Sequence, residues 1–438
     1  MTNARLDGLR LLLLGSLTFI VLGAAFENAS QVPLIDFKGL YYPTQCLIHH
    51  CDPYKQSDVQ NIYQSAGIEH SLDAATVREI ATKQVYPPST FSFILPFAML
   101  PWGPARIVWM TLTVASLIFA AFLLWKFGES YDSVISGALI GLLLANSELA
   151  IITGNPATIA ISFCIVAVWC FLRERFVSLG ILCFAISLAV KPHDTGLVWL
   201  YFLLAGGVYR KRAIQTLIAT AVFCLPSVIW VWHLAPDWIQ ELQSTISGYA
   251  AHGGLSDPGP ASTGGHSLGM IVDLQVIFSF FRDDPRFYNP ASYVISGLLI
   301  LVWVLITLRS RPTPERTWLA LASISALTLL PFYHRQLDTM LLLLTVPACA
   351  MLCAKNGWIG RLALLVTTAA FVLTGFLSWA IFLGFLGNLH LPATRSANQI
   401  LIAVQALPTP LILLLTGVFY LWVYARHCST EDLRPGLL

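Results

Sequence analysis

Charged residues are scarce in this sequence. Asp, Glu, Lys and Arg make up 11% of its 438 residues, hydrophobic residues make up 56%, and the mean hydropathy is +0.71. A chain of this composition takes the lipid bilayer as its solvent, which excludes an ordinary water-soluble protein. The sequence therefore predicts an all-α, polytopic integral membrane protein.

A large excess of positive charge is also missing. The formal net charge of +2 and the sequence pI near 8.1 supply no extended basic surface, which excludes nucleic acid as a partner. The sequence contains no internal repeat, no low-complexity tract and no segment with the composition of a soluble domain. We therefore expect residues 1–438 to form a single transmembrane domain.

Apolar runs predict about twelve membrane-spanning helices. Their expected ranges are about 8–26, 105–126, 134–152, 156–172, 176–190, 195–208, 213–232, 290–308, 316–331, 338–353, 360–386 and 400–424. The run 89–101 is too short to span a bilayer and is bounded by Pro87, Pro88 and Pro101. We expect it to be a short re-entrant or interfacial helix in the outer leaflet.

Basic residues in short loops predict the orientation of the chain. They are Arg5, Arg10, Arg173, Arg175, Arg210, Lys211, Arg212, Arg309, Arg311, Arg316, Lys355, Arg361 and Arg426. All of them lie on one side if both termini are cytoplasmic and the first helix is an uncleaved anchor. The protein is then a multi-pass protein of the inner (plasma) membrane.

In this orientation, four connections share the extracytoplasmic, periplasmic face. Two are short, at 191–194 and 332–338, and two are long, at about 28–88 and 233–289. The first long loop has helical patterns, as in residues 74–84, and is expected to form an ordered cap. The second is rich in Gly and Pro, a composition typical of an adaptable loop.

Most of the nine cysteines lie inside apolar runs, where Cys behaves as a small hydrophobic residue. Cys46 and Cys51 lie in the first outer loop, where a disulfide is chemically permitted. Together with His49 and His50 they could instead bind a metal. No second cluster of Cys and His completes a closed site, so we expect no metal there.

Asp36 is the first residue that could carry chemistry. It follows the first helix by some nine residues and lies between hydrophobic residues at the expected membrane surface. Partial desolvation makes such a carboxylate usable as a base near neutral pH. The alternative is that Asp36 only caps a helix or a turn. Asp52, in Asp52-Pro53-Tyr54, has the pattern of a turn residue.

Two short polar connections supply further candidates. In Lys191-Pro192-His193-Asp194, a cation fixed at the membrane interface could hold a lipid-linked phosphate, or Lys191 could merely extend its amine from a helix end to water. The second connection is Tyr333-His334-Arg335-Gln336-Leu337-Asp338. There Asp338 could cap a helix and pair with Arg335, or the donors could bind an anion.

These motifs and their order resemble an enzyme family. The matching pieces are Asp36-Phe37, Tyr41-Tyr42, Asp52-Pro53-Tyr54, Tyr86-Pro87-Pro88, Pro96 to Trp109, Thr153-Gly154-Asn155, Lys191-Pro192, and Tyr333-His334 with Asp338. Up to about residue 350 the chain resembles the GT-C type integral membrane glycosyltransferases of family 87, which include mannosyl- and arabinofuranosyltransferases of cell-envelope assembly. It departs from the family pattern at residues 153–155, where a Gln is usual beside the glycine.

The resemblance implies transfer of a sugar, such as mannose or arabinofuranose, from a polyprenyl-phosphate donor to a glycolipid or glycan acceptor. Asp36 would be the base that activates the acceptor, and Lys191, His334 and Arg335 would bind the donor phosphate. Candidate substrate-binding residues are Tyr41, Tyr42, Tyr86, Asn155, His193, Tyr333 and Asp338. Membrane lipids surround the protein, and we expect no cofactor and no metal.

The chemistry fits a single carboxylate. The leaving phosphate monoester has a second pKa of about 6, so it departs without a general acid, and one displacement inverts the anomeric carbon. A secondary transporter of about twelve helices is an alternative, although Glu148 is the nearest approach to a mid-span charge. A polyprenyl-linked glycan ligase or polymerase is another alternative. Such an enzyme is expected to have an Arg-rich outer loop, whereas the loop 233–289 of this chain contains only Arg282 and Arg286.

Overall fold

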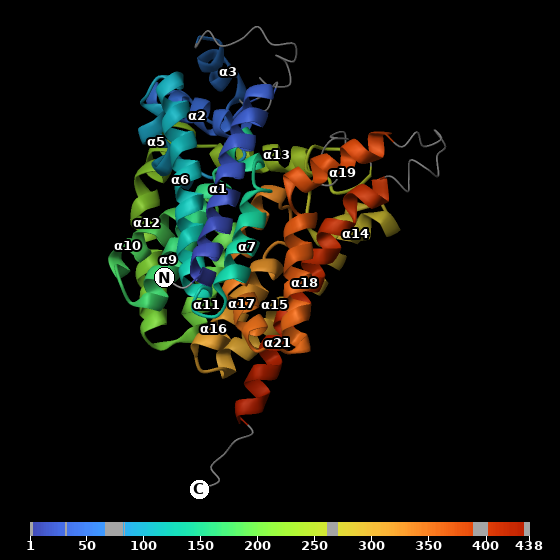
Figure 1. Cartoon of the computed structure of the whole chain (residues 1–438). Helices are drawn as coiled ribbons and strands as arrows, with labels where there is room; N and C mark the ends of the chain where they lie inside the picture. The colour runs from blue at the N-terminus through green and yellow to red at the C-terminus, as the bar shows by residue number, and fades with distance from the viewer. Residues whose placement is uncertain are drawn as a thin grey trace.

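The computed structural model describes residues 3–30, 33–65, 82, 84–260, 270–388 and 402–432. Within these ranges the chain is built from helices and contains no β-strand; one isolated bridge pairs Ile271 with Arg335. Figure 1 shows most of the helices side by side in one bundle. The predicted all-α class is confirmed.

Seven stretches of the described residues are long and apolar enough to cross a membrane. They are α1 (Asn3–Ala29), α6 (Trp102–Gly128), α7 (Ser133–Leu144) with α8 (Leu149–Thr153), α12 (Gly207–Leu234), α15 (Pro285–Arg309), the 3-10 helix η1 (Gln336–Leu344) with α17 (Thr345–Ala354), and Ile402–Cys428, which contains most of α21 (Pro408–Asp432). The prediction of a polytopic helical membrane protein is therefore confirmed.

The count of about twelve spans is not confirmed and stays a prediction. Four of the expected spans are helices of only 14 to 17 residues: α9 (Ala157–Arg173), α10 (Val177–Val190), α11 (Pro192–Ala205) and α16 (Pro314–Leu327). Each is shorter than the roughly 20 residues that cross a bilayer unaided. A helix of 14 residues rises about 21 Å, whereas the hydrocarbon core is about 30 Å thick.

The segment expected to span at 360–386 is not one straight helix, and its crossing of the membrane as one span stays a prediction. The chain forms α18 (Trp358–Leu373) and α19 (Phe376–Asn388), which meet at a bend of 70°. The side-chain oxygen of Asn146 accepts hydrogen bonds from the backbone N–H of Ser378 (2.9 Å) and from its hydroxyl (2.7 Å). The continuous apolar run gives no sign of this bend, because Asn146 lies in a distant part of the chain, the turn between α7 and α8.

Short helices collect at one end of the bundle. Figure 1 shows α2 (Ile35–Ile48), α3 (Gln56–Ser65) and α5 (Ser89–Ala98) at the end opposite to the C-terminal end of α21, with α13 (Trp238–Ala250) toward the same side. Helix α5 has ten residues and corresponds to the short segment that was not expected to span. Most of the helical pattern at 74–84 and part of the Gly- and Pro-rich loop lie outside the described residues.

An aromatic cluster holds α2 against α6. The ring of Phe37 stacks on Trp109 with centroids 4.4 Å apart, and the Tyr41 hydroxyl donates to the carbonyl of Leu100 (2.7 Å). Tyr42 stacks on Trp102 and is 1% exposed. Tyr41 and Tyr42 therefore lie in the packed interior of this end of the molecule.

Cys46 and Cys51 form a disulfide, which answers the alternative left open by the sequence. Both thiols are used in this bond, so they do not bind a metal together with His49 and His50. The bond joins the last turn of α2 to the connection that precedes α3.

Helices α1 and α7 contact each other backbone to backbone through glycines. A Cβ atom on Gly15 would lie 2.3 Å from the Cα atom of Gly141, and one on Gly137 would lie 2.0 Å from the carbonyl oxygen of Gly8. Small residues are the usual device for close approach of helices in membranes. This contact fixes α1, the helix that leads into α2 and Asp36.

We expect Gly15→Ala to destabilise the fold by about 1–3 kcal/mol, because the added methyl group forces α1 away from α7. The measurement is thermal unfolding of the detergent-solubilised protein, followed by the fluorescence of its 13 tryptophans. Gly297→Ala in α15 is the matched control, since a Cβ atom there meets no heavy atom within 4 Å. Equal unfolding temperatures for the two variants would contradict the proposed contact.

Candidate functional site

Polar side chains from five separate parts of the chain meet near the end that carries α2 and α5. Tyr86, before α5, interacts electrostatically with Asp36, Lys191, Tyr333 and Asp338, which places these groups together. Hydrogen bonds and ion pairs of these residues add Asn155, Arg335, and Asp194 with its two histidines to the group. We call it the polar cluster; its members are Asp36, Tyr86, Asn155, Lys191, His193, Asp194, Tyr333, His334, Arg335 and Asp338.

Gly154 allows the α8–α9 connection to reach Asp36. It adopts φ +64°, and a Cβ atom there would lie 2.8 Å from Cδ2 of Leu34, so only glycine fits easily. The carbonyl of Gly154 accepts from Nε1 of Trp109 (2.9 Å). The backbone N–H of Leu34 donates to the carbonyl of Ile152 (2.8 Å), which joins the start of α2 to α8.

Asp36 and Asn155 are hydrogen-bonded across this connection. The side-chain oxygen of Asn155 accepts from the backbone N–H of Ala157 (2.9 Å), so its Nδ2 group faces the carboxylate. Nδ2 donates to Oδ2 of Asp36 (2.9 Å) and lies 3.5 Å from the Tyr86 hydroxyl. Leu34, rather than Asp36, occupies the cap position of α2. The alternative that Asp36 only caps this helix is therefore wrong.

Lys191 is buried in the break between α10 and α11. Its Nζ atom contacts Oδ1 of Asp338 and lies 3.3 Å from Oδ2 of Asp194. Burial opposes the charged amine, but the two carboxylates outweigh it, so the pKa of Lys191 is raised. At 6% exposure the residue does not extend to water, and that alternative is wrong.

Asp194 faces two imidazole rings. Its Oδ1 atom lies 3.4 Å from Nε2 of His193 and 3.4 Å from Nε2 of His334. Burial raises the pKa of Asp194, but Lys191 and His334 lower it further, so the net pKa is below the usual value. Among the described residues, neither Asp194 oxygen makes a hydrogen bond of normal geometry.

The two histidines differ in exposure. His334 is 0% exposed, and its Nδ1 atom lies 2.8 Å from the carbonyl oxygen of Phe332, to which it can donate. Burial lowers the pKa of His334, but Asp194 raises it more, so the pKa is raised overall. The side chain of His193 is 38% exposed, and desolvation is the main cause that lowers its pKa.

Asp338 joins the segment before η1 to Lys191. Its Oδ2 atom accepts from the backbone N–H of Arg335 (2.7 Å), so the cap expected from the sequence is present, while Oδ1 contacts Lys191. Nε of Arg335 contacts the hydroxyl of Tyr333, and its guanidinium group interacts electrostatically with Asp36. Arg335 therefore lies between the proposed base and the Lys191 region.

The sequence analysis missed Asp273. The backbone N–H of Gln336 donates to the carbonyl of Met270 (2.9 Å), and that of Val272 donates to the carbonyl of His334 (3.0 Å). These bonds dock the end of the second long loop on the polar cluster. Oδ1 of Asp273 caps α14 (Leu274–Phe281), and burial raises its pKa to about 7, opposed by His334. An Asp before an apolar helical run was the only available signal.

The role of Asp194 was also not predicted, since within the motif Lys191-Pro192-His193-Asp194 only Lys191 and His193 were assigned a function. Of the seven candidate substrate-binding residues, Tyr86, Asn155, His193, Tyr333 and Asp338 belong to the polar cluster. Tyr41 and Tyr42 belong instead to the aromatic cluster that packs α2 on α6. Their burial at 3% and 1% exposure favours a structural role over contact with a substrate.

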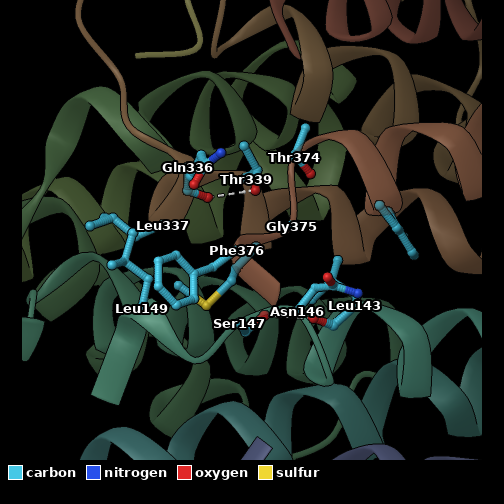
Figure 2. Close-up of a pocket in the computed structure, with 12 residues that line it drawn as sticks. Leu143, Asn146, Ser147, Leu149, Gln336, Leu337, Thr339, Thr374, Gly375 and Phe376 are labelled. Atoms are coloured by element: carbon cyan, nitrogen blue, oxygen red, sulfur yellow. Dashed lines mark hydrogen bonds between the residues drawn. The ribbon is translucent and has the colours of Figure 1, made fainter. Parts of the chain in front are cut away.

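A small cavity lies on another face of η1, and Figure 2 shows its lining. Gln336 and Thr339 of η1 face Asn146 and the α18–α19 bend at Thr374 and Gly375. Its volume of about 20 Å³ is enough for one water molecule and far too small for a sugar. We therefore place the functional site at the polar cluster and not at this cavity.

A family model described as glycosyltransferase family 87 matches residues 85–332. The match includes Tyr86, Asn155 and the Lys191–Asp194 break, and it ends just before the Tyr333–Asp338 segment. No curated protein matches the chain, and no solved structure matches it.

Proposed function

The chain belongs to glycosyltransferase family 87 and is a membrane glycosyltransferase, and we propose that it uses a polyprenyl-phosphate sugar as donor. The sugar, mannose or a pentose such as arabinofuranose, is moved to a glycolipid or glycan acceptor. The carrying observation is the polar cluster itself, in which the carboxylate of Asp36 is bound by an amide and interacts electrostatically with Arg335, while Tyr86 interacts with both Asp36 and Lys191. Family membership argues against the transporter and the ligase alternatives.

In this proposal Asp36 is the general base. It takes the proton from an acceptor hydroxyl while the hydroxyl oxygen attacks the anomeric carbon of the donor sugar. The bond between that carbon and the phosphate oxygen breaks, and the phosphate leaves with the electron pair. Because the attack and the departure occur on opposite faces, the anomeric configuration is inverted. The phosphate monoester, with a second pKa of about 6, needs no acid to leave, and the step as written needs no metal.

The donors around the phosphate have unequal roles. Lys191 is already bound by Asp194 and Asp338, so it contributes a fixed positive charge more than a free hydrogen-bond donor. Arg335 would face the phosphate oxygens directly, because it also interacts with Asp36. His334 would hold the phosphate from the side of Asp194. Fixed cationic groups of this kind stabilise the charge that grows on a leaving group.

Two observations support an extracytoplasmic site in the plasma membrane with both termini in the cytoplasm. The Cys46–Cys51 disulfide lies on α2, the helix that carries Asp36, and disulfides persist in oxidising compartments. Basic residues near other helix ends, such as Arg5, Arg212 and Lys355, pair with Glu129, Glu174 and Glu315. This separation agrees with the excess of Lys and Arg in cytoplasmic loops.

The short helices also support a lipid-linked donor. Helices α10 and α11 have 14 residues each, and the Lys191 break that joins them is reached after a rise of only about 21 Å. That rise falls short of the roughly 30 Å hydrocarbon core, so the break would lie close to the bilayer boundary rather than far above it. A donor could then place its phosphate at the cluster while its prenyl chain stays in lipid.

The direct test is incubation of membranes that contain the protein with radiolabelled polyprenyl-phosphate sugars. A panel with mannose and arabinofuranose, followed by fractionation of lipid, glycan and protein products, identifies both substrates. We expect label in the product fraction only when the sugar is supplied as its polyprenyl-phosphate. Transfer from nucleotide sugars in the absence of a prenyl carrier would contradict the proposal.

Asn155→Ala should lower kcat by about 10- to 100-fold while donor affinity stays within about twofold. The hydrogen bond from Asn155 holds the carboxylate of Asp36, and bonds to charged groups contribute about 1.5–3 kcal/mol. Tyr86→Phe is the matched comparison, because Nδ2 of Asn155 lies 3.5 Å from that hydroxyl but 2.9 Å from Asp36. An unchanged kcat in Asn155→Ala would remove its positioning role.

A further inference from the structure

We propose that His193, Asp194 and His334 form a binding site for one divalent metal ion of the zinc type, with an open position toward the donor phosphate. Their ligand atoms all lie within 4.8 Å of one another. The open position and its use by the phosphate rest on the proposed function, whereas metal binding by the three side chains does not.

The distances from the carboxylate to the two rings fit a tetrahedral ion. Oδ1 of Asp194 lies 3.4 Å from Nε2 of each histidine. Zinc bonds of about 2.0–2.1 Å place two ligand atoms of a tetrahedron about 3.3–3.4 Å apart. The same oxygen is therefore at ligand spacing from both rings. Two His and one carboxylate with a free fourth position is the donor set of catalytic zinc sites.

Asp194 lies at ion-pair distance from both rings, but hydrogen bonds of normal geometry are missing among the three side chains. Nε2 of His334 and both oxygens of Asp194 are buried, and no hydrogen bond of normal geometry reaches them from the described residues. His334 and Asp194 are each 0% exposed. Buried polar atoms without partners are costly unless water, a proton or an ion occupies the space between them.

The surroundings orient these ligands as in known metal sites. Nδ1 of His334 lies 2.8 Å from the carbonyl oxygen of Phe332, and donation to that carbonyl leaves Nε2 with its lone pair toward Asp194. The two oxygens of Asp194 have different partners. Oδ2 lies 3.3 Å from Nζ of Lys191, and Oδ1 faces the two imidazole rings. The ammonium group therefore approaches the carboxylate oxygen that does not face the rings.

The charge balance of the polar cluster favours an added cation. Its charged groups are the cations Lys191 and Arg335 and the carboxylates Asp36, Asp194 and Asp338. Counted without the two imidazoles, whose protons a bound metal ion would displace, these groups sum to one negative charge. A divalent ion reverses the sum to one positive charge, which suits a phosphodiester. Bound at the open position, the phosphate oxygen would complete the coordination.

The test measures zinc binding directly, without donor or acceptor. Purified protein is stripped with a chelator, re-equilibrated with Zn²⁺, and analysed for bound metal, with affinity measured by competition against a chromogenic chelator. Binding of Co²⁺ followed by its visible absorption gives a second readout. We expect one Zn²⁺ per chain, not displaced by millimolar Mg²⁺, because imidazole ligands disfavour Mg²⁺.

His193→Ala is the informative variant, because its side chain is partly exposed and its loss should leave the fold intact. We expect it to weaken zinc binding at least about 100-fold, since even the loss of outer partners of a metal site costs about 10- to 100-fold. Asp194→Asn should behave alike. His252→Ala is the control, because His252 belongs to a separate group with Asp257 and Asp283.

Less than stoichiometric zinc in the wild type, or equal zinc affinity in His193→Ala, would overturn the site. Loss of binding in His252→Ala instead would assign the ion elsewhere and overturn it as well. Because sugar transfer is assayed separately, failure of transfer with intact zinc binding rejects the proposed function and leaves the metal site standing. Sugar transfer by a protein that binds no zinc rejects the metal site and leaves the proposed function standing.

Discussion

Asp36→Asn should reduce the rate of sugar transfer by about 10²- to 10⁴-fold, the range that general-base catalysis contributes. Asparagine keeps the size of the side chain and an oxygen that can accept from Asn155, but it cannot take the proton of the acceptor hydroxyl. Donor affinity should change by no more than about threefold. The measurement is a transfer assay with the purified variant, together with equilibrium binding of the labelled donor.

Asp52→Asn is the matched control for this variant. Asp52 lies in the connection between α2 and α3, where its Oδ1 atom accepts from the backbone N–H of Tyr54 (2.9 Å), and the amide oxygen of asparagine preserves that turn. Transfer by Asp52→Asn should stay near the wild-type rate. Near wild-type transfer by Asp36→Asn would instead remove Asp36 from the catalytic step, whatever the control does.

The helical class and the meeting of the polar motifs followed from the sequence, because apolar length and helix-breaking residues act locally. Lys191 and Pro192 interrupt two apolar runs, and Gly154 interrupts another, so the positions of these turns are written in neighbouring residues. Loop order then brings the turns to one end of the bundle. No long-range information was needed to predict that Asp36, Lys191 and His334 lie on one face.

The partners of those residues could not be predicted in the same way. Asp194 and Asp273 are single acids at helix starts, where an Asp most often serves only as a cap. Their contacts with His334 depend on how the 270–274 segment docks beside the 333–338 segment, a pairing of two distant connections. The sequence contains no local signal for such a pairing.

The bend between α18 and α19 and the burial of Tyr42 are missed for a related reason. The apolar run through Thr374 and Gly375 is long enough for one helix, and the bend is fixed by Asn146 in the distant turn between α7 and α8. Tyr42 lies in a motif of polar aromatic residues, but stacking on Trp102 turns it inward. Packing between elements decided both outcomes.

Lys191→Met should destabilise the protein by about 3–5 kcal/mol and weaken donor binding at least about tenfold. Removal of the ammonium group leaves the carboxylates of Asp194 and Asp338 buried without their cation, and breaking a buried ion pair from one side carries a cost of this size. Acceptor binding should change less, because in the proposed mechanism the acceptor contacts Asp36. Thermal unfolding and separate donor and acceptor titrations measure the three effects.

A double variant separates the two roles of Lys191. Asp338→Asn removes one unpaired charge yet keeps an oxygen that accepts from the backbone N–H of Arg335, so Lys191→Met with Asp338→Asn should recover much of the lost stability. Donor affinity should stay low, because the positive charge near the phosphate is still absent. Recovery of both stability and donor affinity would mean that Lys191 only neutralises its neighbours, and Arg335 and His334 would then hold the phosphate without it.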